Sequence, residues 1–311
     1  MHVLNTLVPV FLVMGLGAAL RRGRFFSDAF VQGTNRLVYW VGLPCLLFRS
    51  LAGARDLGGG APVAVVVLGG MVACVAVALG AGRLLRLHAE RVGTFVQGAF
   101  RANIAYVGLA VVSLAHPGAP HARAMELAVI VLALTAPVYN VVAVGALLAS
   151  RHRLARAAVG RLVVGVVTNP IILACAAGLA FALLTRPAGA ALPPVVDQSL
   201  AWIGQFALPL ALLGIGAALA TTRIRGRAAP ALVAAVIKVG VGPAAGVALA
   251  ALLALGPVET RVALLMLACP TATASYVLAD QLGGDGPLAA AIVVASTLLS
   301  ALSLGAVLAL T

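Results

Sequence analysis

The sequence has few charged residues, and acidic residues are the scarcest of them. Charged residues make up 9% of the 311, with 8 Asp and Glu against 21 Lys and Arg. A soluble domain carries about 25% charged residues. Here 63% of the residues are hydrophobic and the mean hydropathy is +1.13. The composition therefore predicts an all-α membrane protein with many spanning segments and excludes an ordinary soluble domain.

Motifs for metal binding and for catalysis are also missing. The four cysteines lie in apolar runs without CxxC spacing, which argues against a disulfide framework or a zinc site. The sequence has no HExxH motif, no Gly-rich phosphate loop after a strand and no plausible Ser–His–Asp set. We expect neither an enzyme nor a bound metal or other cofactor.

The net charge of +13 comes almost entirely from arginine, because Lys238 is the only lysine. Thirteen arginines fall in the connections after the first, third, fifth and seventh apolar segments, and five on the alternate side. This split follows the positive-inside rule and does not resemble a phosphate-binding face. It predicts a lipid bilayer as partner and no nucleic acid. It also predicts a multi-pass protein of the cell (inner) membrane with both termini extracytoplasmic.

Ten apolar segments are long enough to be spanning helices, since a crossing needs about 20 mainly apolar residues. They cover approximately residues 3–20, 34–51, 61–82, 93–115, 123–149, 158–184, 197–220, 229–255, 260–281 and 286–310.

The ten segments divide into two halves of five. Pro44 in the second segment and Pro209 in the seventh are 165 residues apart, and the same shift places Ala105 on Pro270. Because five is odd, the second half must enter the membrane upside down, which is the inverted repeat of many secondary transporters. We expect a first repeat over 1–150, a cytoplasmic linker over 151–160 and a second repeat over 161–311.

The ninth segment contains a proline followed by hydroxyl side chains. Pro270 removes a backbone donor, so the helix is expected to break or kink there. The hydroxyls of Thr271, Thr273 and Ser275 then have two possible roles, binding a solute or bonding back to their own helix.

Polar residues in the fourth and eighth segments are the other candidates. A break near Asn103, before Gly108, would direct a half-helix N-terminus at an anion. Arg101 either joins that site or extends to the membrane surface. Lys238 lies near the middle of an apolar helix, so it must face a cavity, form an ion pair or lose its proton. It could balance the carbonyl ends of broken helices or attract an anion.

These motifs together resemble the auxin efflux carrier family, a family of membrane transport proteins. The matching features are Arg101-x-Asn103 followed by Gly108, Leu43-Pro44, Pro137 to Asn140, Asn169-Pro170, Lys238 followed by Pro243, Pro270 with Ser275-Tyr276, and Ser296-Thr297. The chain departs from the family at Ala110, where a first crossover proline is expected. We therefore expect a less sharply broken fourth helix.

The resemblance implies ten helices in two inverted repeats, with helices 4 and 9 unwound where they cross. Helices 1, 2, 6 and 7 would form a scaffold, and helices 3–5 and 8–10 an elevator-like transport unit. Asn103 would contact a substrate carboxylate, and Tyr139 would line the pocket.

We therefore expect a carrier of small organic anions, chiefly carboxylates. The alternatives are a sodium-coupled symporter of the bile acid type and a membrane sensor that binds a ligand without moving it. The candidate substrate-binding residues are Arg101, Asn103, Tyr139, Asn140, Lys238, Pro270, Thr271, Thr273 and Ser275. The candidate structural positions are Pro44, Gly108, Ala110, Pro209 and Pro270. Asn140, Ser296 and Thr297 are the candidates for a cation. Coupling to sodium or protons, and a homodimer, stay open.

Overall fold

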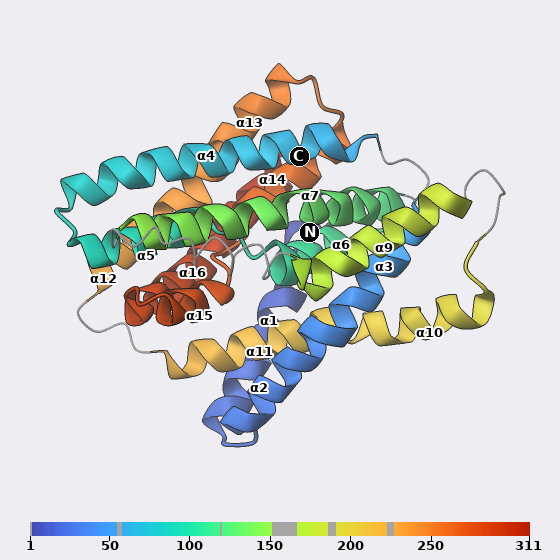
Figure 1. Cartoon of the computed structure of the whole chain (residues 1–311), viewed down its shortest axis with the longest axis horizontal. Coiled ribbons are helices and arrows are strands. Elements are labelled where there is room, and N and C mark those ends of the chain that lie inside the picture. The colour runs from blue at the N-terminus through green and yellow to red at the C-terminus, as the bar shows by residue number, and fades with distance from the viewer. Residues whose placement is uncertain (1, 55–57, 119, 151–166, 186–190, 223–226) are drawn as a thin grey trace.

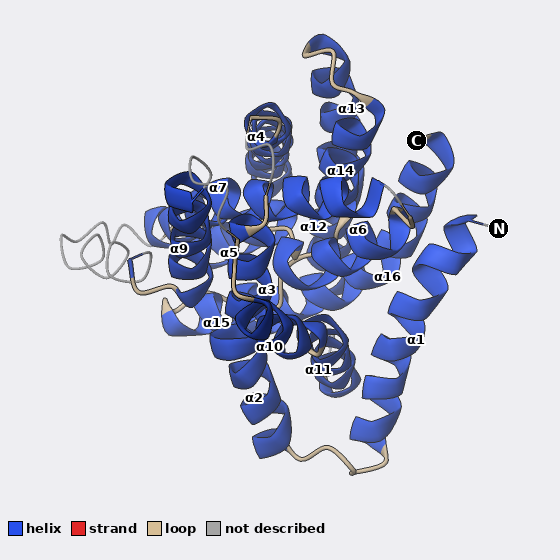
Figure 2. Cartoon of the chain, turned by 90° about the vertical axis from the view of Figure 1, so that its right-hand side faces the viewer, coloured by secondary structure: helices blue, strands red, loops and turns tan. Residues whose placement is uncertain are grey.

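The described part of the chain consists of helices joined by loops, with one isolated β-bridge (Figures 1 and 2). The computed structural model describes residues 2–54, 58–118, 120–150, 167–185, 191–222 and 227–311. Within these residues, six helices are long and apolar enough to cross a membrane, and two apolar helices are shorter. The six are Val3–Arg22, Gly60–Leu84, Pro120–Ala149, Pro194–Thr221, Ala228–Leu252 and Gly286–Leu310, and the two are Ile104–Ala115 and Pro170–Thr185. The chain is thus an all-helical, multi-pass membrane protein.

Each of the ten expected segments coincides with helix, although residues 158–166 lie outside the described part. The elements are α1 (His2–Arg22), α2 (Asp28–Leu37), η1 (Val38–Gly42), α3 (Leu43–Ala52), α4 (Gly60–Leu84), α5 (Ala89–Phe100), η2 (Ile104–Gly108), α6 (Leu109–Ala115), α7 (Pro120–Ala149), α9 (Pro170–Thr185), α10 (Pro194–Gln205), α11 (Ala207–Thr221), α12 (Ala228–Val236), η4 (Ile237–Val241), α13 (Gly242–Leu252), α14 (Pro257–Ala268), α15 (Ala274–Gln281) and α16 (Gly286–Leu310). The second segment starts at Asp28, earlier than expected, because Ser27 caps it and its Oγ accepts from the Phe30 N–H at 3.1 Å.

Prolines explain where several of these helices change geometry. A proline removes one i→i−4 hydrogen bond and crowds the preceding turn. The π-helical turns η1 and η4 directly precede the segments that contain Pro44 and Pro243. Pro209 lies just after the junction of α10 and α11 at Phe206. A π-turn adds one residue to the turn and accommodates the missing bond without ending the helix.

Close packing at glycines joins α1 to α11. A Cβ atom at Gly216 would overlap the Met14 carbonyl, and one at Gly17 would overlap the Leu213 carbonyl. Likewise, a Cβ at Gly178 of α9 would lie 2.6 Å from the Phe48 carbonyl oxygen of α3. Small residues allow this approach, which is the usual way that helices associate in membranes. Helices α1, α3, α9, α10 and α11 thus pack largely among themselves.

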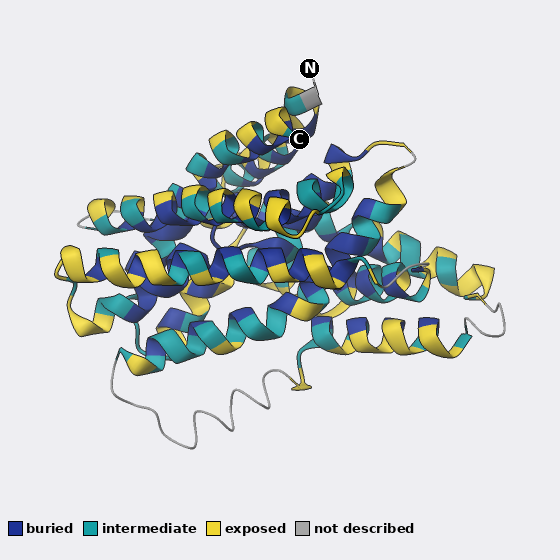
Figure 3. Cartoon of the chain, turned by 90° about the horizontal axis from the view of Figure 1, so that it is seen from above, coloured by how far each residue is buried: buried dark blue, intermediate teal, exposed yellow. Residues whose placement is uncertain are grey.

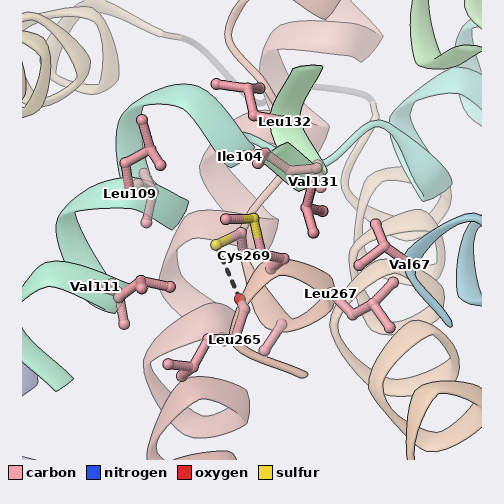
Figure 4. Close-up of a cluster of buried hydrophobic side chains, with 14 of the residues drawn as sticks. Val67, Ile104, Leu109, Val111, Val131, Leu132, Leu265, Leu267 and Cys269 are labelled. Atoms are coloured by element: carbon pink, nitrogen blue, oxygen red, sulfur yellow. Dashed lines mark hydrogen bonds between the residues drawn. The ribbon is translucent and has the colours of Figure 1, made fainter. Parts of the chain in front are cut away.

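A second set of helices encloses the most buried residues. In it α4 contacts α5, α7, α13 and α14, and α16 contacts α5, α12, α14 and α15. Figure 4 shows one part of this core, where side chains of α4, η2, α6, α7 and α14 gather around Cys269. Its Sγ lies 3.1 Å from the Leu265 carbonyl oxygen. Figure 3 shows exposed residues along the outer helices, and many large apolar residues are among the exposed ones, which suits a lipid environment.

Candidate functional site

The first interruption separates α5 from η2. Helix α5 ends at Phe100, Arg101 is extended (ψ 92°), and helix resumes at Ile104. The carbonyl of Asn103 accepts from the N–H groups of Val107 and Gly108 at 3.2 and 3.0 Å. Asn103 therefore immediately precedes a new helical N-terminus, as the sequence suggested.

The second interruption separates α14 from α15. Helix α14 ends at Ala268, and Cys269 is extended with ψ 148°. This conformation follows from Pro270, which disfavours helical geometry at the preceding residue. Helix resumes at Ala274 as the short α15.

The two interrupted segments pair with each other through their backbones. Ala102 and Thr271 form an isolated antiparallel bridge. The Asn103 N–H donates to the Pro270 carbonyl and the Ala272 N–H to the Arg101 carbonyl, both at 2.8 Å. Backbone groups released by one break are therefore satisfied by the other. Such pairing is required at membrane depth, where unpaired polar groups are costly.

Side chains satisfy further backbone groups at the crossing. Thr271 Oγ1 donates to the Gly98 carbonyl at 2.7 Å, and the Thr271 N–H donates to Ser296 Oγ at 2.9 Å. Gln97 Nε2 donates to the Ser275 carbonyl at 2.9 Å. Thr271 and Ser296 thus hold the crossing together and do not line the cavity described next.

A cavity of about 1160 Å³ lies beside the crossing. Of the candidate substrate-binding residues, it is lined by Arg101, Asn103, Tyr139, Asn140 and Thr273. The lining does not include Pro270, Thr271, Ser275, Lys238, Ser296 or Thr297. Five of the nine candidates are therefore brought together at one surface.

Arg101 extends into this cavity and has unused hydrogen-bonding capacity. Its Nη2 donates to Asn140 Oδ1 at 2.6 Å, while its buried Nη1 has no hydrogen-bond partner. The buried hydroxyl of Tyr139 also lacks a partner. No carboxylate in the described part of the chain forms an ion pair with Arg101. The cavity wall therefore includes the positively charged Arg101, which has no paired carboxylate among the described residues.

The cavity lining also contains polar residues that the sequence did not single out for binding. Asn35 and Tyr39 contribute from the α2–η1 segment, Asn169 precedes α9, and Gln281 ends α15. Asn35 and Tyr39 are four residues apart, so they share a helix face. That spacing was the one available signal, and only the folded arrangement shows that this face looks onto the crossing.

Lys238 and the three cation candidates have other contacts. Lys238 Nζ donates to the Leu267 carbonyl at 2.6 Å and is buried, with 1% of the residue exposed. Asn140 Oδ1 accepts from Arg101, and the hydroxyls of Ser296 and Thr297 donate to the Val293 carbonyl at 3.1 and 2.7 Å. Within the described residues, no contact brings these three oxygens together as ligands of one cation.

Ala110 lies inside α6, seven residues after Asn103, with 5% of its surface exposed. The break therefore comes before this position and forms without a proline there. Ala110 lines a second cavity of about 730 Å³, together with Arg49 and Asp197. Gly108 immediately precedes α6, and a Cβ there would meet Cys269 Sγ at 3.5 Å.

Comparison with known proteins identifies the family of the chain. A family described as membrane transport protein matches residues 2–158 and 150–307. No curated protein matches the chain. The fold and the match define a transporter, and the chain is not an enzyme. It belongs to the membrane transport protein family, which is the auxin efflux carrier family.

Proposed function

We propose that this transporter carries small organic anions, chiefly carboxylates, by alternating access. The observation that carries the proposal is the guanidinium of Arg101, which faces a cavity with one nitrogen unpartnered and no paired carboxylate among the described residues. A buried cation without a counter-ion favours a negatively charged ligand. A carboxylate can accept hydrogen bonds from the Arg101 guanidinium.

The helix that starts after Asn103 also favours a negatively charged substrate. The first N–H groups of a helix lack intrahelical partners, and its N-terminus carries a partial positive charge. An anion there gains about 0.3–1 kcal/mol, and more when partly buried. We assign the Asn103 amide as a further donor to the substrate, because no hydrogen bond within the described chain engages its side chain.

The positions of the two cavities support alternating access. The larger cavity reaches Arg21, Thr222 and Gln281 near the arginine-rich connections. The smaller one is lined by Arg49 and Asp197, whose ion pair joins α3 to α10 at 2.8 Å on the alternate side. In this proposal the conformation is open to the cytoplasm, and both termini are extracytoplasmic.

The packing supports a division into scaffold and transport unit. We propose ten crossings in two inverted repeats over 1–150 and 161–311. The mutual packing of α1, α3, α9, α10 and α11 suits a scaffold, and the second set of helices, which contains both interruptions, suits the moving unit. An elevator movement would carry the paired interruptions as one body.

Uptake by proteoliposomes tests the proposal. Reconstituted protein is offered labelled mono- and dicarboxylates, with and without a sodium gradient. We expect saturable uptake and counterflow, and a strong reduction of both in Asn103→Ala. Tight binding without counterflow would instead indicate a sensor, and strict dependence on the gradient would indicate a sodium symporter.

A further inference from the structure

The only lysine of the chain is fully enclosed and contacts the end of a broken helix. Lys238 belongs to η4, and its Nζ donates to the Leu267 carbonyl at 2.6 Å. Leu267 is the penultimate residue of α14, one of the last four whose carbonyls lack intrahelical partners. This end of a helix carries a partial negative charge. The ammonium therefore neutralises the carbonyl end that the break at Pro270 exposes.

The π-turn that presents Lys238 is itself held at two points. Cys74 Sγ lies 3.6 Å from the Ile237 carbonyl, and Ser303 Oγ donates to the Val239 carbonyl at 2.5 Å. These contacts come from α4 and α16, on either side of η4. Lys238 is therefore directed at α14 by fixed neighbours and does not extend to a membrane surface.

The surroundings of Lys238 contain no negative side chain that could explain it. No carboxylate in the described ranges pairs with Lys238, and the titratable groups near it are the thiols of Cys74 and Cys269. The other interruption has a neutral counterpart, because the Gly98 carbonyl of α5 accepts from Thr271 Oγ1. The Leu267 carbonyl of α14 thus accepts from a charged ammonium, whereas the Gly98 carbonyl of α5 accepts from a neutral hydroxyl.

We infer that the ammonium of Lys238 occupies a built-in cation site, in which a tethered charge holds the carbonyl end of α14 in place of a bound metal cation. The site takes a primary ammonium, which can donate N–H bonds to the Leu267 carbonyl. One consequence rests on the proposed function: the carrier moves its anion without a bound sodium ion. The statement about the site itself requires no substrate.

Thermal unfolding of the purified full-length protein tests the site by chemical rescue. We expect Lys238→Ala to lower the Tm by about 5 °C, because a charged hydrogen bond is lost and a buried carbonyl is left unpaired. Propylammonium chloride should restore the Tm of this variant in proportion to its concentration. Choline chloride at the same ionic strength has no N–H donor and should not.

Two controls make the rescue specific. Ser303→Ala removes a neutral bond to the same π-turn, so propylammonium should leave its Tm and that of the wild type unchanged. In the wild type, sodium chloride and choline chloride should give the same Tm. Three results would each overturn the inference. The first is an equal Tm shift with propylammonium in all variants, and the second is a Lys238→Met variant as stable as the wild type. The third is specific stabilisation of the wild type by sodium.

If Lys238→Ala does not accumulate, two further substitutions test the cation site. Lys238→Arg keeps a charged donor and Lys238→Gln a neutral one. A higher Tm for Lys238→Arg supports the cation site, and equal values overturn it. Carboxylate uptake is measured separately, so a protein that passes these tests but moves no anion would contradict the proposed function alone.

Discussion

Arg101 and Asn140 are joined by a hydrogen bond of 2.6 Å from Nη2 to Oδ1, across 39 residues of chain. The bond links the interruption after α5 to the middle of α7. It fixes one side of the guanidinium plane and leaves Nη1 without a partner. Asn140 therefore orients the positive charge of the cavity without neutralising it.

Arg101→Gln should weaken anion binding. A hydrogen bond to a charged group contributes about 1.5–3 kcal/mol, so we expect the apparent affinity for the transported carboxylate to fall by about 10- to 100-fold. Concentration-dependent uptake measures the change. Arg22→Gln, outside the cavity lining on the same side, is the control and should behave as wild type.

Asn140→Asp should also reduce uptake, for a different reason. The new carboxylate would pair with Arg101 and neutralise the charge that attracts the substrate. Asn140→Gln keeps an amide acceptor and should retain more activity than the aspartate variant. Equal uptake by the aspartate variant and the wild type would show that the charge of Arg101 is not used.

Asn103→Ala should slow transport but leave the fold intact. The backbone N–H of Asn103 still donates to the Pro270 carbonyl in the variant, so the bridge is preserved. We expect a normal gel-filtration profile and at least about 10-fold slower uptake, the effect of one lost charged hydrogen bond. Asn5→Ala, on the exposed face of α1, is the matched control.

Thr271→Val and Thr273→Val should separate stability from binding. The first variant loses the bond from Oγ1 to the Gly98 carbonyl and leaves a buried acceptor unpaired, a cost of about 1–3 kcal/mol. Thr273 lines the cavity and is only half-buried. We expect a lower Tm for Thr271→Val, and altered uptake with an unchanged Tm for Thr273→Val.

Gly216→Ala should destabilise the contact between α1 and α11. An added methyl group would overlap the Met14 backbone, and overpacking of this kind costs about 1–3 kcal/mol. Gly15→Ala provides the control in the same pair of helices, since nothing lies within 4 Å of its added Cβ. If both variants had the same Tm, the close packing would not contribute to stability.

The sequence predicted the helical segments well because lipid imposes long apolar runs. The interruptions near Asn103 and Pro270 were also predicted, one from polar residues in an apolar run and one from proline chemistry. The start of the second segment at Asp28 was missed because the Ser27 cap extends a polar first turn. The break before Ala110 needs no proline, because backbone groups of Pro270 and Ala272 satisfy it.

The partners of individual side chains could not be predicted. Thr271 and Thr273 are two residues apart and chemically identical, yet one bonds to α5 and the other faces the cavity. Lys238 contacts a carbonyl of α14 and not the cavity. These differences depend on how distant helices meet, which hydropathy and spacing along one segment do not encode.

The bridge between Ala102 and Thr271 has a consequence for how the protein is made. The Asn103 N–H and the Arg101 carbonyl take partners that the ribosome adds only when residues 270–272 are synthesised. Until then, the fourth segment enters the bilayer with a break that its own half of the chain does not satisfy. The ninth segment therefore supplies the partners of the break in the fourth segment. A fragment that ends before Pro270 should remain a substrate for membrane proteases.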